Sequence, residues 1–115
     1  SSMLSWLSRQ ETPSPEEAFD FEAVLKADVA VLFKHSPSCA TSWFARSEVN
    51  AFAEEHPAIP VHTISVRNRA LAREIAERVN VRHESPQVIV FRRGQVVAHT
   101  SHEGVTAEYL AEATR

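Results

Sequence analysis

The 115-residue sequence predicts an α/β fold in which a central four-stranded mixed β-sheet is flanked by helices. Continuous apolar runs mark strands, and stretches with apolar residues at three- and four-residue intervals mark helices. The two kinds of segment alternate along most of the chain, which is typical of a sheet with parallel strands. A strand pair joined by a tight turn near the C-terminus supplies an antiparallel part. Several folds share the resulting order of α, β, α, β, α, β, β, α.

The first predicted helix begins at Ser14. The run Ser14-Pro15-Glu16-Glu17 combines a capping residue, a proline at the first helical position and a glutamate three residues after the cap. Phe21, Val24 and Leu25 give this helix an apolar face. The apolar run Val29-Ala30-Val31-Leu32-Phe33 follows, and its β-branched residues indicate a strand buried on both faces. This run is therefore the predicted central strand.

The remaining elements follow the same rules. Ser36-Pro37-Ser38 separates the central strand from the next helix, Arg93-Gly94 forms the tight turn, and Thr106 is the expected cap of the last helix. The predicted elements are a helix over 39–55, a strand over 61–66, a helix over 71–79, a hairpin of strands over 88–91 and 95–99, and a helix over 106–113.

Composition predicts one globular domain and excludes several function classes. Hydrophobic residues make up 43% of the chain, and no linker or repeat divides it, so we expect one domain over 14–115 with an N-terminal extension over 1–13. A net charge of −3 without a basic stripe argues against nucleic-acid binding. No apolar run is long enough to span a membrane, and the first residues are too weakly apolar for a signal peptide. A single cysteine excludes an intramolecular disulfide, so we expect a cytoplasmic protein.

The single cysteine, Cys39, is the candidate nucleophile. It lies after the central strand and opens the next helix, where unpaired N–H groups and the helix dipole favour a thiolate. Ser42, in the first helical turn, can donate a hydrogen bond to the sulfur but cannot form a disulfide with it. A lone cysteine is more often a small buried hydrophobe. A strand-to-helix junction beside a polar loop instead favours an accessible, reactive thiol.

Four histidines are candidates to lie near the thiol, where an imidazolium would lower the thiol pKa further: His35, His83, His99 and His102. His35 and His83 are the better candidates because they flank the predicted site. For any one of them, a loop or strand-end position without thiol contact is the commoner alternative. No C-x-x-C or H-x-x-x-H spacing is present, so no metal site is expected. Trp43 and Phe44 are expected to pack in the core and at its rim.

The residues around Cys39 resemble known redox sites. The run Val31-Leu32-Phe33-Lys34-His35-Ser36-Pro37-Ser38-Cys39-Ala40-Thr41-Ser42 is similar to a glutaredoxin active-site segment, with a strand and loop before C-x-x-C or C-x-x-S. It is closer to the YtxJ-type monothiol bacilliredoxins of the bacillithiol system, which carry Phe-Lys-His-Ser and then Thr-Cys-Pro-Ile-Ser. Further matches lie over 81–87 and 99–102, so the resemblance extends from about residue 23 to the C-terminus. Ser38 and Ala40 depart from the motif, which has threonine and proline there.

The resemblance implies a thioredoxin-like fold and a set of site residues. Pro86 would occupy the cis-proline position that faces the active cysteine, although a Ser-Pro pair before a strand is also an ordinary turn. The backbone of Ser85 would pair with the incoming substrate. Ser38 and His83 complete the expected substrate-binding residues, and Ser42 and His35 are expected to support the thiolate.

The resemblance also implies thiol-disulfide exchange, with bacillithiol as the thiol co-substrate and no bound cofactor. The Cys39 thiolate would attack a mixed disulfide between bacillithiol and a client protein, and an external thiol or redox protein would resolve the adduct. Lys34, Arg67 and Arg82 are candidates to steer this carboxylate-bearing thiol, although such residues are more often solvated surface. Two alternatives stay open, a redox-inactive interaction module with the same fold and a thiol redox sensor.

Overall fold

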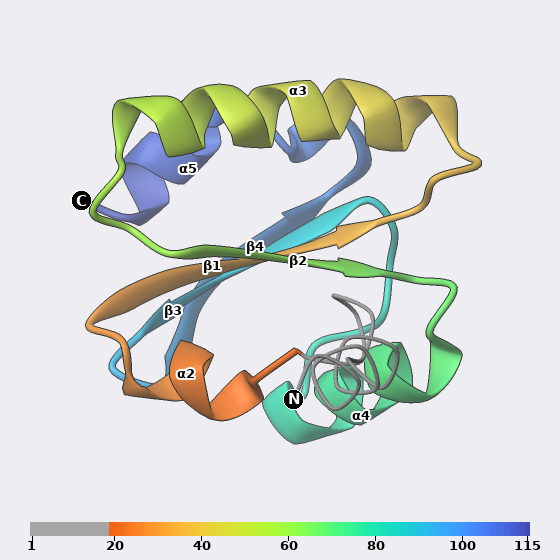
Figure 1. Ribbon diagram of the computed structural model, residues 1–115, viewed down its shortest axis with the longest axis horizontal. Coiled ribbons are helices and arrows are strands. Elements are labelled where there is room, and N and C mark those ends of the chain that lie inside the picture. Colours follow the sequence, from red (N-terminus) through yellow and green to blue (C-terminus); the bar gives the residue numbers. More distant parts are fainter. Residues whose placement is uncertain (1–18) are drawn as a thin grey trace, which may run out of the picture.

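The computed structural model describes residues 19–115 and shows one sheet between two pairs of helices (Figure 1). The predicted helix start at Ser14, and the proposed domain boundary beside it, lie outside these residues. The expectation that the same helix continues to Phe21 and Val24 is wrong, because residues 19 and 20 are not helical and the helix that carries Phe21 begins there, after the N-cap residue Asp20. The elements are α2 (Phe21–Lys26), β1 (Val29–His35), α3 (Ala40–Glu55), β2 (Val61–Ser65), α4 (Arg69–Val79), β3 (Gln87–Arg92), β4 (Gln95–Ser101), the short 3-10 helix η1 (His102–Gly104) and α5 (Ala107–Ala113).

The sheet has the strand order β2-β1-β3-β4. β1 pairs in parallel with β2, where Lys34 lies opposite Ile64, and antiparallel with β3, where Lys34 lies opposite Gln87. β3 pairs antiparallel with β4, with a register shift at Val90 and Phe91. The predicted α/β fold with a mixed four-stranded sheet is therefore confirmed, and β1 is an internal strand as its apolar sequence predicts.

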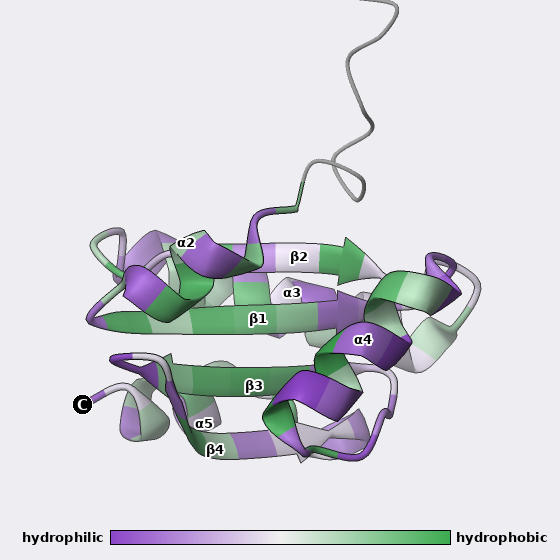
Figure 2. Cartoon of the chain, turned by 90° about the horizontal axis from the view of Figure 1, so that it is seen from below, coloured by the Kyte–Doolittle hydropathy of each residue, from purple (hydrophilic) through white to green (hydrophobic). Residues whose placement is uncertain are grey.

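Helices cover both faces of the sheet, with α3 and α5 on one face and α2 and α4 on the other (Figure 1). Successive residues of β1 point to opposite faces, so Ala30 and Leu32 join one core while Val31 and Phe33 join the other. This double burial explains the unbroken apolar runs of β1 and β3, which stand out as hydrophobic in Figure 2. Within residues 19–115, no helix is long and apolar enough to cross a membrane.

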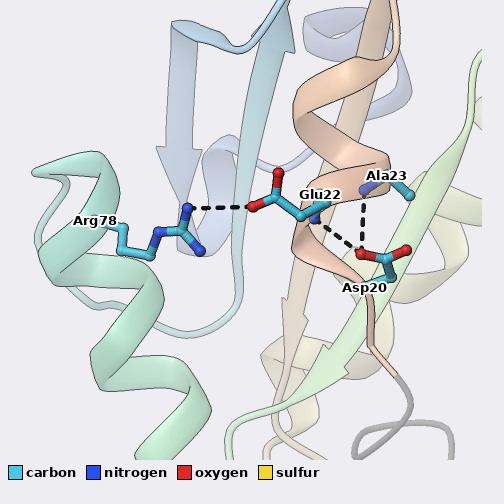
Figure 3. A network of polar contacts seen from close by, with 4 residues as sticks. All are labelled: Asp20, Glu22, Ala23 and Arg78. Carbon is cyan, nitrogen blue, oxygen red and sulfur yellow. Dashed lines mark hydrogen bonds and ion pairs between the residues drawn. The ribbon is translucent and has the colours of Figure 1, made fainter.

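α2 is fixed at its start and attached to α4 by polar contacts (Figure 3). The Asp20 carboxylate accepts hydrogen bonds from the backbone N–H groups of Glu22, at 3.0 Å, and Ala23, at 3.3 Å. Such a cap stabilises a helix by about 1 kcal/mol. The Glu22 carboxylate lies 3.5 Å from the Arg78 guanidinium of α4, which also lies over the Phe21 ring.

The expectation that Trp43 and Phe44 pack in the core is wrong, because these side chains are 53% and 77% exposed. The buried face of α3 consists of Ser42, Ala45, Val49 and Phe52. Their spacing of three and four residues defines one stripe along the helix, and Trp43 and Phe44 fall beside it.

Two features were not predicted. β1 continues two residues past the apolar run, so that Lys34 and His35 are part of the strand and are buried. After β4 the chain forms η1, where His102 has a positive φ of 55° and donates its backbone N–H to the Pro86 carbonyl at 2.9 Å. This bond holds the end of β4 against the residue that precedes β3.

Candidate active site

The sheet brings the Cys39 loop and the Ser85–Pro86 segment to the same edge. Lys34 is the last β1 residue paired with β3, and its partner Gln87 is the first residue of β3. The chain therefore leaves β1 toward Cys39 where it enters β3 from Pro86, on the right-hand side of Figure 1. The Ser85–Pro86 peptide bond is cis.

Cys39 is the N-cap residue of α3, with extended backbone angles, and its free thiol is half-buried. Its N–H donates to the Ser36 carbonyl at 3.2 Å, and its carbonyl accepts from the Ser42 N–H at 3.1 Å. Hydrogen bonds from the backbone N–H groups of Ser42 and then Thr41 lower the pKa of the Cys39 thiol, with smaller contributions from their hydroxyls, while desolvation opposes them. A lowered pKa increases the thiolate fraction at neutral pH.

Ser42 positions the loop as well as the thiol. Its side chain is fully buried, and its hydroxyl oxygen accepts a hydrogen bond from the Ser36 N–H at 3.1 Å. The contribution of Thr41 to the lowered pKa of Cys39 was not predicted. Its position in the first helical turn, between the cysteine and the serine of C-x-x-S, could have indicated it. Ser38 lies exposed in the loop directly before Cys39.

Trp43 also holds the loop that precedes Cys39, through Pro37. Its indole N–H donates to the Pro37 carbonyl at 3.0 Å, and its ring meets His35 edge-on with centroids 5.1 Å apart. The Arg46 guanidinium lies 5.5 Å from the Trp43 ring centroid. The loop is thus held by Trp43 and by Ser42, on two neighbouring positions of α3.

His35 is buried, with 5% of its surface exposed, and its Nδ1 atom has no hydrogen-bond partner among the described residues. Burial first and the nearby Arg46 charge second lower the pKa of His35, although hydrogen bonding with the Ser42 backbone acts in the other direction. His35 is therefore mainly neutral at pH 7, and it is not among the groups that lower the pKa of Cys39. Its thiolate-supporting role stays a prediction.

His83 is joined to the end of β1 by Lys34. The Lys34 Nζ atom lies 3.0 Å from His83 Nδ1, and burial lowers the pKa of Lys34 to about 8. An ammonium group only donates hydrogen bonds, so Nδ1 accepts, and the ring proton of the neutral imidazole is on Nε2. Burial, followed by the Lys34 charge, lowers the pKa of His83 and favours this neutral form.

The segment before Pro86 is held by the buried side chain of Gln87. Its Nε2 donates to the Arg82 carbonyl at 2.9 Å, and its Oε1 accepts from the Glu84 N–H at 3.4 Å. The Glu84 carboxylate accepts from the Ser101 hydroxyl at 2.5 Å, which is the first cause of its lowered pKa. The Ser85 hydroxyl is buried and has no partner within the described part of the chain.

His99 and His102 contribute to the electrostatic potential at the Glu84 carboxylate and help to lower its pKa. Both histidines therefore lie near Glu84, on the β4 side of the segment before Pro86. Over residues 19–115, no group of three or more His, Cys, Asp or Glu side chains is arranged to hold a metal ion. The architecture thus gathers a low-pKa thiol, a loop held by Ser42 and the Ser85–Pro86 segment at one sheet edge.

Known proteins share this architecture. The family described as monothiol bacilliredoxin BrxC matches residues 11–110. A solved structure of a proposed oxidoreductase with a thioredoxin fold superposes with a TM-score of 0.76 and 33% identity, over 83% of this chain and 86% of that chain. Thioredoxin from Trypanosoma brucei brucei gives a TM-score of 0.65 and 18% identity, over 81% of this chain and 78% of that chain. Fasciola hepatica thioredoxin gives a TM-score of 0.64 and 19% identity, over 82% of this chain and 86% of that chain.

At these low identities, the two thioredoxins show the fold alone. The thioredoxin-like fold that the resemblance implied is confirmed. The family match covers the loop, the thiol and the segment before β3, and it extends upstream of the described residues. The chain belongs to the monothiol bacilliredoxin family, whose members are thiol redox proteins.

Proposed function

We propose that the protein removes bacillithiol from mixed disulfides on client proteins, with Cys39 as the nucleophile. The observation that carries this proposal is the half-buried thiol at the N-cap of α3, whose pKa is lowered by hydrogen bonds from Ser42 and Thr41. A thiolate, and not a thiol, performs disulfide exchange. The family match supports mixed disulfides with bacillithiol as the substrate class.

The exchange proceeds in two steps. The Cys39 thiolate attacks the bacillithiol sulfur of the mixed disulfide, a new disulfide forms between Cys39 and bacillithiol, and the client sulfur leaves as a thiolate that takes a proton from water. The chain has no second cysteine, so an external thiolate must then attack the adduct and regenerate the Cys39 thiolate. That thiolate comes from a second bacillithiol molecule or from another redox protein.

The substrate-binding residues in this proposal are Ser38, His83, Ser85 and Pro86. The register between β1 and β3 supports the assignment of Ser85 and Pro86, because it brings their segment to the edge from which the Cys39 loop leaves. The exposed position of Ser38 and the tie between His83 and Lys34 support the other two. We also propose that the protein acts in the cytoplasm, where a single thiol stays reduced.

The test uses the reduced protein and bacillithiol disulfide. Mass spectrometry should show one bacillithiol added on Cys39, and no addition to the near-isosteric variant Cys39→Ser. A bacillithiolated client should then release its thiol in the presence of the wild-type protein and not of the variant. Absence of an adduct on a protein whose thiol titrates as free would refute the proposal.

A second candidate is an interaction module, because Trp43 and Phe44 expose large apolar surface close to Cys39. This module would bind partners without turnover. Alkylation of Cys39 with iodoacetamide separates the two functions, since it abolishes bacillithiol release but leaves the aromatic side chains in place. Partner binding that survives alkylation, together with absent release by the free thiol, would favour the module.

A further inference from the structure

A groove with a volume of about 910 Å³ lies between α4 and the segment 80–83, which leads toward Ser85. This volume is within the range of small-molecule sites. Buried Ala72 from α4 and buried Val81 from the opposite segment line it. Most of the other lining residues are polar or charged.

The rim of the groove is positively charged, although the whole chain has a net charge of −3. Arg69, Arg73 and Arg82 line it, against one carboxylate, that of Glu77. Arg69 and Arg73 are four residues apart on α4 and therefore share a helix face. Among the ion pairs formed between residues 19 and 115, none involves Arg69 or Arg73. Arg82 also forms none of these pairs, but its charge helps to lower the pKa of the Glu84 carboxyl.

Two hydrogen bonds connect the groove to the sheet edge that carries Cys39. Val66 lines the groove, and its backbone N–H donates to the His35 carbonyl at 3.0 Å. His83 also lines it and is joined through Nδ1 to Lys34, so its Nε2–H group stays available as a donor. Arg82, which the sequence suggested as a residue that steers the thiol, lines this groove. Lys34, another such candidate, is hydrogen-bonded to His83, which also lines the groove.

We propose that this groove binds the carboxylates of the low-molecular-weight thiol, with Arg69, Arg73 and Arg82 as the binding residues. The inference rests on the proposed function and adds to it the site that binds the carboxylates of small thiols and disulfides. Guanidinium groups bind carboxylates through paired hydrogen bonds, which are stronger than those between neutral groups. The groove therefore selects anionic small disulfides over neutral ones of similar reactivity.

The first experiment measures binding without chemistry. Bacillithiol disulfide is titrated into isotopically labelled Cys39→Ser protein, which cannot form the adduct, and NMR shifts are followed. The amide signals of Arg69, Arg73 and Arg82 should move in a saturable manner. Unchanged signals at these residues would overturn the inference, whatever the outcome for adduct formation in the wild type.

The second experiment compares the rates at which Cys39 forms adducts with bacillithiol disulfide and with neutral bis(2-hydroxyethyl) disulfide. The double variant Arg69→Gln/Arg73→Gln should slow the reaction of the anionic disulfide about tenfold or more and that of the neutral disulfide less than about twofold. The control variant Arg93→Gln removes a single positive charge at the β3–β4 turn, at the opposite end of β3, and should change neither rate. Equal slowing of both disulfides, or of neither, would overturn the inference while adduct formation itself still supports the proposed function.

Discussion

Replacing Lys34 with methionine tests whether the buried ammonium group beside the active site destabilises the folded protein. The Lys34 side chain is fully buried, and its Nζ atom is hydrogen-bonded to His83 at 3.0 Å. Burial lowers its pKa from 10.5 to about 8. This difference corresponds to about 3 kcal/mol between the charged and neutral forms in the folded protein. Methionine has a similar length and carries no charge.

The sign of the pH dependence follows from proton binding. Between pH 8 and pH 10.5 the unfolded chain keeps the Lys34 proton while the folded protein has lost it, so the free energy of unfolding rises with pH. Below pH 8 both states are protonated, and the folded state carries the full cost of the buried ammonium. Lys34→Met should therefore raise the free energy of unfolding at pH 7 by about 1 to 3 kcal/mol, since the lost hydrogen bond offsets part of the gain.

Urea unfolding at pH 7, 8, 9 and 10, followed by circular dichroism, measures this effect. The stability advantage of Lys34→Met over the wild type should shrink steadily above pH 8. Other groups that titrate there, including Cys39, are present in both proteins and cancel in the difference. Lys26→Met, at the exposed end of α2, is the matched control because Lys26 is the only other lysine of the chain. A difference that stays constant from pH 7 to 10 would refute the reasoning.

Three further substitutions test the loop, the segment before β3 and the core. Ser42→Ala removes the acceptor of the Ser36 N–H, so it should lower the free energy of unfolding by about 1 to 2 kcal/mol. It also removes the hydroxyl contribution to the lowered pKa of Cys39 while keeping the larger backbone contribution, so it should shift iodoacetamide alkylation of the thiol slightly to higher pH. An unchanged alkylation profile would contradict this role. Gln87→Leu leaves the Arg82 carbonyl without its donor and should cost about 1 to 3 kcal/mol, with faster amide exchange over 82–84; protected amides would argue against the contact. Phe52→Ala, at a site 1% exposed, should cost about 3 to 5 kcal/mol in urea unfolding, and a loss below about 1 kcal/mol would show loose packing there.

Much of the fold was predictable because the signals are local. The apolar run from Val29 specifies a strand buried on both faces, and Thr106 accepts a hydrogen bond from the Tyr109 N–H as the expected cap of α5. The position of Cys39 at the start of α3 also followed from sequence, since a strand, a polar loop and a helical pattern meet there. Periodicity and capping report backbone geometry within a few residues, and this geometry determines secondary structure.

Sequence by itself determined the order of the elements, the single thiol and its place at a helix start. Only the tertiary structure decided that Lys34 is buried, that Trp43 is exposed, and that arginines from α4 and from the segment before Ser85 line one groove. These facts depend on which elements pack together and on which helix face meets the sheet. A pattern of residues along one segment contains no information about its partner, so the surroundings of the thiol emerge only when the strands are in register.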